Sequence, residues 1–300
     1  MTSPNSGERS ILFAAALFIV LCALVVAWPV GVAVVGLLPV PLVVFAAKGV
    51  RVGPPMMAAL IAVLLYVRGF QWAALLIGLA AYFIGWTLGD VLKWRQRPYH
   101  ALIWCTLVIV LLELVGLAAL KNAGVDIYGE WRQAVVQALV DQGVSAADAQ
   151  DFGAVMAQQF HLLTPALLCI QGFLLSVIQL VLGQWLLGPR AHATGWLLAF
   201  RLPASVAGVY VLTALLQLFS WQDIAPFWWQ ACSNASLIAE FFLGVQGLAW
   251  SWRLAARIAS PAGQLWIRLL LLMVSPLPVI NNLFVLAGLI DIMNGRKRFG

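Results

Sequence analysis

The sequence contains very few charged residues. Only 9% of its 300 residues are Asp, Glu, Lys or Arg, whereas 63% are hydrophobic. A typical soluble domain carries about 25% charged residues. A chain this poor in charge cannot cover its surface with polar side chains, so the shortage excludes an ordinary soluble domain. We therefore expect most of the chain to face lipid or other membrane helices.

Cysteine and histidine are also scarce, and their spacing excludes the common metal and catalytic motifs. The four cysteines are scattered without a CxxC pair. The histidines His100, His161 and His192 lie far apart, in or beside expected loops. HExxH, GxSxG and phosphate-binding glycine-rich motifs do not occur. We therefore expect no enzymatic activity, no metal and no cofactor.

The formal net charge of +6 does not indicate a nucleic-acid-binding protein. Lys and Arg collect in short segments between apolar runs, as they do in the cytoplasmic loops of membrane proteins. The expected partners are therefore the lipid bilayer and, as a further possibility, a membrane partner subunit.

Long apolar runs make up most of the chain. A membrane-spanning helix needs about 20 predominantly apolar residues. The sequence predicts an all-α polytopic integral membrane protein with about eight transmembrane helices, and residues 1–300 form a single membrane domain. The expected spans are residues 11–28, 30–47, 56–67, 70–92, 101–120, 162–187, 204–219 and 233–252.

Two of the apolar stretches are interrupted by closely spaced prolines. The second run contains Leu38-Pro39-Val40-Pro41, and the last stretch, residues 265–298, contains Pro276 and Pro278. Proline removes a backbone donor and kinks or breaks a helix. At membrane depth the freed backbone groups must be satisfied by protein or by a water-filled cavity. We expect the last stretch to fold as a hydrophobic hairpin or as a kinked ninth helix.

A long hydrophilic and acidic insertion occupies residues 121–161. Apolar residues recur there at helical spacing, and Ser145-Ala146-Ala147-Asp148 has the form of a capping box. The insertion is expected to form two amphipathic helices over the membrane surface.

The distribution of basic residues predicts the orientation in the membrane. With a cytoplasmic N-terminus and alternating spans, the outer side receives only Arg68, Lys121 and Arg132. This positive-inside bias places the acidic insertion outside the cytoplasm. The terminal cluster Arg296, Lys297 and Arg298 returns to the cytoplasm if the last stretch folds back, and we expect this arrangement. The cytoplasmic side then also receives Arg9, Lys48, Arg51, Lys93, Arg95, Arg97, Arg190, Arg201, Arg253, Arg257 and Arg268.

Several motifs, in their order along the chain, resemble the YybS-like bacterial membrane proteins, a family defined as a domain of unknown function (DUF2232). The resemblance implies a bacterial inner-membrane protein. It also implies a more distant similarity to the substrate-binding S subunits of energy-coupling-factor vitamin transporters and to MreD-type envelope proteins. The motifs are Leu38-Pro39-Val40-Pro41 with Lys48-Gly49, Arg201-Leu202-Pro203, Asn234 with Gln246-Gly247-Leu248-Ala249, and Gly288-Leu289-Ile290-Asp291 with Arg296-Lys297-Arg298.

Ionisable side chains inside membrane spans are costly and are therefore candidates for a functional role. Two lie well inside the expected spans, Glu113 in the fifth run and Glu240 in the eighth. Together with nearby amides they predict either a polar, outward-open pocket for a small solute or a set of interhelical hydrogen bonds worth about 0.6 kcal/mol each. The amides that could share this interior are Gln171, Gln179, Gln246, Asn281 and Asn282.

Small residues recur every four positions in the fourth run, at Ala81, Gly85 and Gly89. This spacing allows a second helix to approach closely. The approaching helix belongs either to this chain or to a partner subunit, and the first alternative is favoured.

Three functions remain open at this stage. The first is a transport-related, solute-binding membrane subunit, and the second is a non-catalytic scaffold of the cell envelope. The third is a stand-alone secondary transporter, which predicts paired broken helices in an internal repeat. The two proline breaks fit the third function, but no wider repeat is visible in the sequence.

Overall fold

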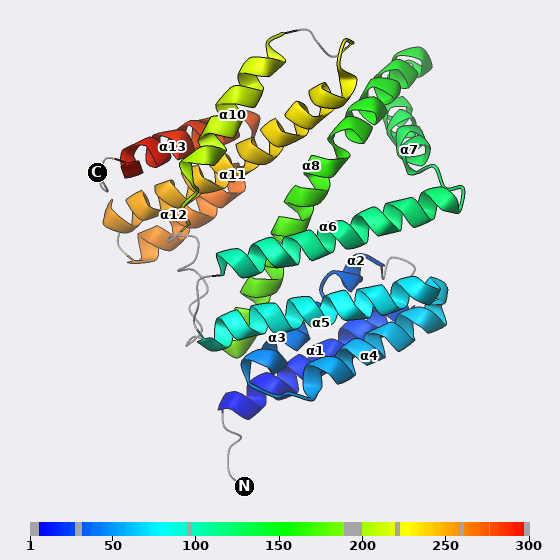
Figure 1. Ribbon diagram of the computed structural model, residues 1–300, viewed down its shortest axis with the longest axis vertical. Coiled ribbons are helices and arrows are strands. Elements are labelled where there is room, and N and C mark those ends of the chain that lie inside the picture. The colour runs from blue at the N-terminus through cyan, green and yellow to red at the C-terminus, as the bar shows by residue number, and fades with distance from the viewer. Residues whose placement is uncertain are drawn as a thin grey trace. The chain divides into compact units, whose positions relative to one another are not determined.

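A computed structural model describes residues 6–27, 32–94, 98–188, 200–219, 223–258, 261–275 and 277–296. All regular structure in these ranges is helical (Figure 1), which confirms the prediction of an all-α protein. The chain divides into two compact units. Unit 1 comprises Met1–Ile127 and Gln171–Ala193, and unit 2 comprises Tyr128–Ile170 and Thr194–Gly300.

Four of the described helices are long and apolar enough to cross a membrane, or five if one strongly bent pair counts as a span. The other expected spans do not form long, uninterrupted apolar helices. Helices α4 and α10 have only 13 and 14 residues, and α11 carries three charged residues and several uncharged polar ones along its length. The four long helices are α1 (Ser6–Ala27), α5 (Gln71–Trp94), α6 (Tyr99–Asn122) and α8 (Ala146–Leu187). The shorter helices are α4 (Gly53–Leu65) and α10 (Ala204–Gln217), and α11 is Pro226–Ile258.

Unit 1 is built around a short, buried helix. The second expected span divides into α2 (Val32–Val35) and α3 (Pro39–Ala47), with Pro39 at the start of α3. Nearly every side chain of α3 is buried, as expected for a helix that is apolar on all sides.

Helix α5 provides the surface on which α3 packs. A Cβ atom at Gly85 would overlap the Cβ of Leu42, and one at Gly89 would overlap the Cβ of Ala46. Ala81, on the same face of α5, is buried in the core of unit 1. The small-residue face is therefore occupied by a helix of the same chain.

A π-helical turn, η2 (Tyr66–Phe70), connects α4 with α5. Gly69 in this turn has a φ angle of 91°, which glycine adopts without the penalty that a Cβ atom imposes. This turn is the tight link between the third and fourth runs.

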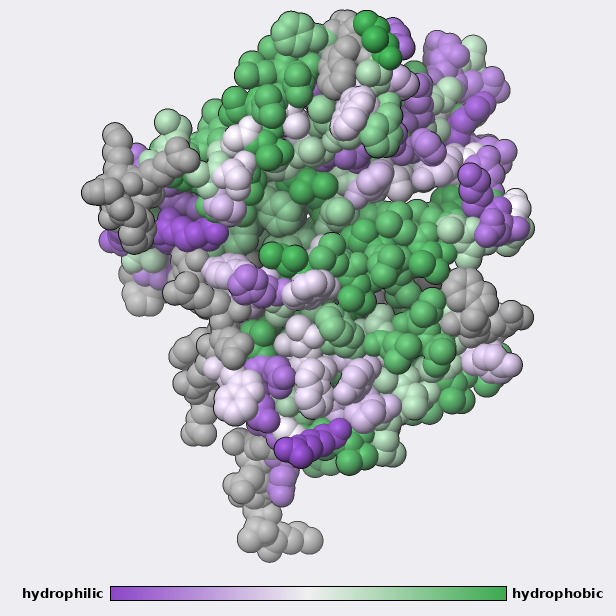
Figure 2. Space-filling view, viewed as in Figure 1, coloured by the Kyte–Doolittle hydropathy of each residue, from purple (hydrophilic) through white to green (hydrophobic). Residues whose placement is uncertain are grey.

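Unit 2 contains the acidic insertion. Helix α7 (Ile127–Asp141) packs against the first turns of α8, with the Trp131 and Phe160 rings stacked at 4.9 Å. The predicted helix start is confirmed, because the Asp148 N–H donates to the Ser145 hydroxyl over 3.2 Å; that hydroxyl in turn donates to the Asp148 carboxylate over 2.6 Å. The second expected amphipathic helix is the beginning of α8, which continues through Pro165. Hydrophilic residues gather over α7 and this part of α8 in Figure 2.

The C-terminal half of unit 2 contains two closely packed parallel helices, α11 and α13 (Pro278–Arg296). Glu240 contacts Asn281, and further along Arg253 contacts Asp291. The contacts advance in the same direction along both helices, so the helices are parallel (Figure 1). A Cβ at Gly247 would overlap the backbone of Phe284, so the two backbones touch at this point.

Parallel packing requires the intervening chain to run back along α11. Helix α12 (Pro261–Val274) does so and is bent by 112° relative to α13. The predicted break in the last stretch is therefore present, although Pro276 itself lies outside the described residues. Asn281, one turn into α13, lies beside Glu240 near the middle of α11. Helix α13 therefore begins halfway along α11.

Candidate functional site

The predicted polar residues form separate hydrogen-bonded groups. In unit 1, the Gln171 side-chain amide donates to a Glu113 carboxyl oxygen over 2.8 Å. The second Glu113 oxygen is buried and has no hydrogen-bond partner among the described residues. This pair links α6 to the C-terminal half of α8.

Gln179, also in unit 1, forms a hydrogen bond with the backbone at the proline break between α2 and α3. Its side-chain N–H₂ donates to the Gly36 carbonyl over 2.6 Å. That carbonyl lies in the turn between the two short helices, where the helical bonding pattern is interrupted. Gln179 is 1% exposed, so its position is explained by the need to satisfy a backbone group in an apolar interior.

In unit 2, Glu240 lines a cleft of about 900 Å³ between α8, α10 and α11. A volume in this range suits a small molecule. The Asn281 amide donates to the Glu240 carboxylate over 3.3 Å. The structure thus brings together two of the predicted ligand-binding residues, whereas Asn282, the next residue on α13, is exposed.

The cleft lining is predominantly polar and contains two carboxylates. Asp223 lies in the turn before α11, and Glu240 lies four turns along that helix. His161 and Phe227 also line the cleft. The remaining polar lining residues are Gln158, Gln159, Gln217, Gln230, Ser233 and Ser236.

Asn234 holds the wall of this cleft at the proline of α8. The Ala166 backbone N–H donates to the side-chain carbonyl oxygen of Asn234 over 2.8 Å. The side-chain NH₂ of Asn234 donates to the Leu162 backbone carbonyl over 2.8 Å. Ala166 and Leu162 are the pair that an uninterrupted helix joins directly. The Asn234 amide therefore bridges α8 next to Pro165 and attaches α11 to it.

A second polar centre lies around Asp291, which is 8% exposed. The Arg253 guanidinium donates to Asp291 over 2.6 Å, and Arg201 donates to both carboxylate oxygens over 3.0 Å. Gln246 also donates to Asp291 and accepts the Leu202 N–H over 3.1 Å. This centre joins the start of α10 to the C-terminal parts of α11 and α13.

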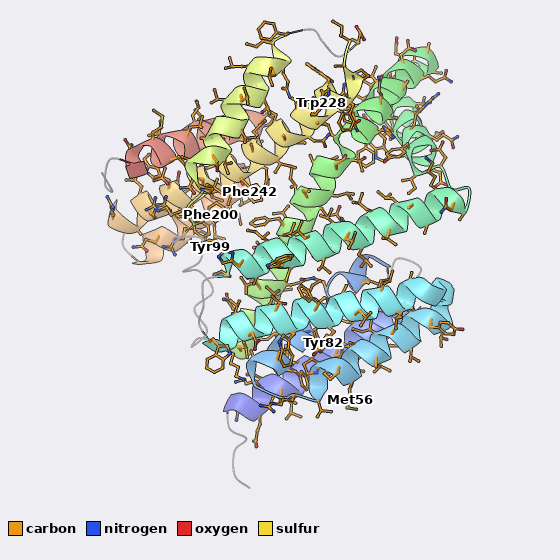
Figure 3. The ribbon with its side chains drawn as sticks, viewed as in Figure 1. Met56, Tyr82, Tyr99, Phe200, Trp228 and Phe242 are labelled. Atoms are coloured by element: carbon orange, nitrogen blue, oxygen red, sulfur yellow. The ribbon has the colours of Figure 1, made fainter. Side chains whose placement is uncertain are left out.

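The cleft and the Asp291 centre lie at opposite ends of the α10–α11 pair. Trp228 marks the end of α11 that borders the cleft, and Phe200 marks the other end (Figure 3). The Phe200 carbonyl accepts a hydrogen bond from Arg253 over 3.4 Å. Unit 2 is thus open at one end and joined by ion pairs at the other.

Sequence reasoning did not select Asp291, Arg201, Arg253 or Asn234 as site residues. Three of them carry motifs that support the family resemblance, at Arg201, Asn234 and Asp291. Their positions near span ends made each consistent with an ordinary surface residue. The signal that could have found them is an acidic residue in one family motif, Asp291, and an arginine in another, Arg201, because two such residues can form an ion pair.

The described residues contain no group of three or more His, Cys, Asp or Glu side chains that could hold a metal ion. The hydrogen bonds and ion pairs of these clusters cross-link helices within each unit.

Comparison with known proteins gives one match. A family model described as "Predicted membrane protein (DUF2232)" matches residues 16–292. No curated protein and no solved structure matches the chain.

Proposed function

The chain belongs to the DUF2232 family of predicted membrane proteins, and from this premise we propose that it is a non-enzymatic, transport-related subunit that binds a small polar solute. The observation that carries the proposal is the polar cleft of unit 2. Glu240 lines this cleft and accepts a hydrogen bond from Asn281, in a helical membrane protein that has few other charged residues.

The location of Glu240 supports a binding role over simple packing. Ionisable residues inside membrane proteins typically face a cavity or pair with one another. Glu240 does the first, because it lines the cleft, whereas Glu113 lies outside the cleft lining and pairs with Gln171. The two carboxylates thus offer a natural comparison between binding and packing.

We place the protein in the bacterial inner membrane with a cytoplasmic N-terminus and with the cleft facing outward. Eight spans, some of them short or interrupted, remain the count that the apolar runs favour. In this arrangement the Arg201–Asp291–Arg253 centre faces the cytoplasm, which agrees with the positive-inside rule. Helices α12 and α13 form a re-entrant hairpin, and the C-terminus returns to the cytoplasm.

The test is solute retention by variants of matched chemistry. Wild-type protein, Glu240→Gln and Glu113→Gln are purified gently from native membranes, and co-purified small molecules are quantified by mass spectrometry. The proposal predicts a stoichiometric small molecule that is lost at least tenfold in Glu240→Gln and kept in Glu113→Gln. Co-purification of envelope-synthesis or division proteins without any small molecule would instead support the scaffold function.

A second candidate, a stand-alone secondary transporter, is favoured by one observation. Each unit contains a helix broken at closely spaced prolines, namely α2/α3 in unit 1 and α12/α13 in unit 2. Discontinuous helices in corresponding halves are typical of such transporters. Uptake of the co-purified solute by proteoliposomes containing only this chain would favour this function over a subunit that requires a partner.

A further inference from the structure

The charge distribution of unit 2 identifies the class of solute that the cleft accepts. We infer that the cleft selects a positively charged organic solute, with Glu240 as its counter-ion; this inference rests on the proposed solute-binding function.

The charged groups of the cleft are acidic. Asp223 and Glu240 are the carboxylates of the lining, and neither Lys nor Arg occurs among its described residues. Arg132, on α7, lies against Gly153 and is not part of the lining. A cleft whose charged groups all have one sign attracts solutes of the opposite sign.

The partners of Glu240 leave its negative charge without a cation. Its side chain is half-buried and receives one hydrogen bond, from Asn281 over 3.3 Å. The two arginines that form ion pairs in unit 2, Arg201 and Arg253, both pair with Asp291 and not with Glu240. A carboxylate has about four acceptor positions, so Glu240 keeps free acceptor positions with which it could bind a ligand.

The partners of Asp291 can be compared with those of Glu240. Asp291 lies in the same helix bundle, and two arginines and an amide surround it. Unit 2 therefore neutralises one carboxylate fully with its own side chains and leaves the other exposed to the cleft. The difference is expected if Glu240 is completed by a cation from solution.

The remaining lining favours an organic cation over a metal ion. Phe227 and Trp229 contribute aromatic rings, whose faces attract ammonium groups. The volume of about 900 Å³ exceeds the needs of a single ion. A cluster of three metal-ligating side chains is also missing from the described part of the chain.

The test measures the electrostatic preference of the cleft directly. Cys22, Cys105, Cys169 and Cys232 are replaced by alanine, and Ser233→Cys is introduced in the lining. The labelling rates of a trimethylammonium methanethiosulfonate and of its sulfonate counterpart are then compared. Glu240→Gln is expected to lower the ratio of cationic to anionic rates by roughly three- to tenfold, whereas Glu113→Gln and Glu240→Asp leave the ratio within about twofold of the parent's.

Two outcomes separate the inference from the proposed function. If both reagents label the cysteine and Glu240→Gln leaves the ratio unchanged, the cleft exists but has no cation preference, and the inference is wrong. If neither reagent labels the cysteine in folded protein, the cleft is closed and the proposed function fails as well. Ser236→Cys replaces Ser233→Cys if the first variant does not elute as folded protein by size exclusion.

Discussion

At the level of single residues, Asp291 has the most extensively compensated charge in the described structure. Arg253 contributes a largely buried guanidinium, with a side-chain exposure of 17%, whereas Arg201 is 58% exposed. Removing one member of a buried ion pair leaves an uncompensated charge and is strongly destabilising, whereas an exposed pair contributes little. The arginines are therefore expected to differ in importance although both contact the same carboxylate.

We predict that Asp291→Asn lowers the free energy of unfolding by about 3–5 kcal/mol, because it leaves Arg253 without its counter-ion. Arg201→Gln is expected to cost about 1 kcal/mol or less. Unfolding of detergent-solubilised protein by denaturant measures both values. Equal losses in the two variants would contradict the expected difference, because Asp291→Asn removes both ion pairs and Arg201→Gln removes only the exposed one.

Asn234 makes an equally specific prediction. Asn234→Ala leaves the Ala166 N–H without its acceptor, whereas the Leu162 carbonyl keeps a hydrogen bond from Gln230. An unsatisfied buried group costs about 1–3 kcal/mol, so we expect a loss of stability of about that size and faster hydrogen exchange at the Ala166 amide. Unchanged exchange would mean that α8 closes its own hydrogen bond when Asn234 is absent.

At the level of the helices, close backbone contact determines which glycines tolerate a side chain. Gly89 lies against Val43 and Ala46 of α3, whereas Gly116 on α6 has no atom within 4 Å of an added Cβ. In unit 2, Gly247 touches Phe284 of α13, whereas Gly208 on α10 is equally free of neighbours. These pairs offer matched controls inside the same units.

We predict that Gly89→Leu and Gly247→Leu separate their helix pairs and abolish the yield of monodisperse protein. Gly116→Leu and Gly208→Leu should retain at least half the wild-type yield, because they face open space. Fluorescence-detected size-exclusion chromatography measures these yields directly. A normal elution profile for Gly247→Leu would contradict the close α11–α13 packing.

At the level of the whole molecule, the path of the last two helices determines on which side of the membrane the C-terminal end of α13 lies. Helix α12 has 14 residues and is about 21 Å long, which is less than the roughly 30 Å of a bilayer core. It runs back along α11 to the level of Glu240, from which α13 returns. This path fits the re-entrant hairpin that we propose for the last stretch.

We predict that a reporter fused after Gly300 is active only when the reporter functions in the cytoplasm. The physical reason is that α11 and α13 are parallel and so end on the same side. A reporter fused after residue 258, at the end of α11, should report the same side as the C-terminal fusion. Opposite sides for the two fusions would contradict the hairpin.

Much of the architecture follows from the order of residues along the chain. Apolar length and scarce charge predict a helical membrane protein, and the proline pairs at 39 and 41 and at 276 and 278 predict two helix breaks. The capping box predicts the start of α8, and the four-residue spacing of Ala81, Gly85 and Gly89 predicts a close helix contact. Each of these features depends either on local backbone chemistry or on the transfer of side chains from water to lipid. Both effects act within a single segment of the chain.

The identity of interacting segments came only from the tertiary structure. The sequence grouped seven polar residues in one interior, but the structure gives Glu113, Gln179, Glu240 and Gln246 different partners. The family motifs at Arg201, Gln246 and Asp291 meet in one centre although 90 residues separate the first from the last. A hydrogen bond depends on distance in space and not in sequence, so only the packing of α8, α10, α11 and α13 could decide which carboxylate is neutralised and which faces a cleft.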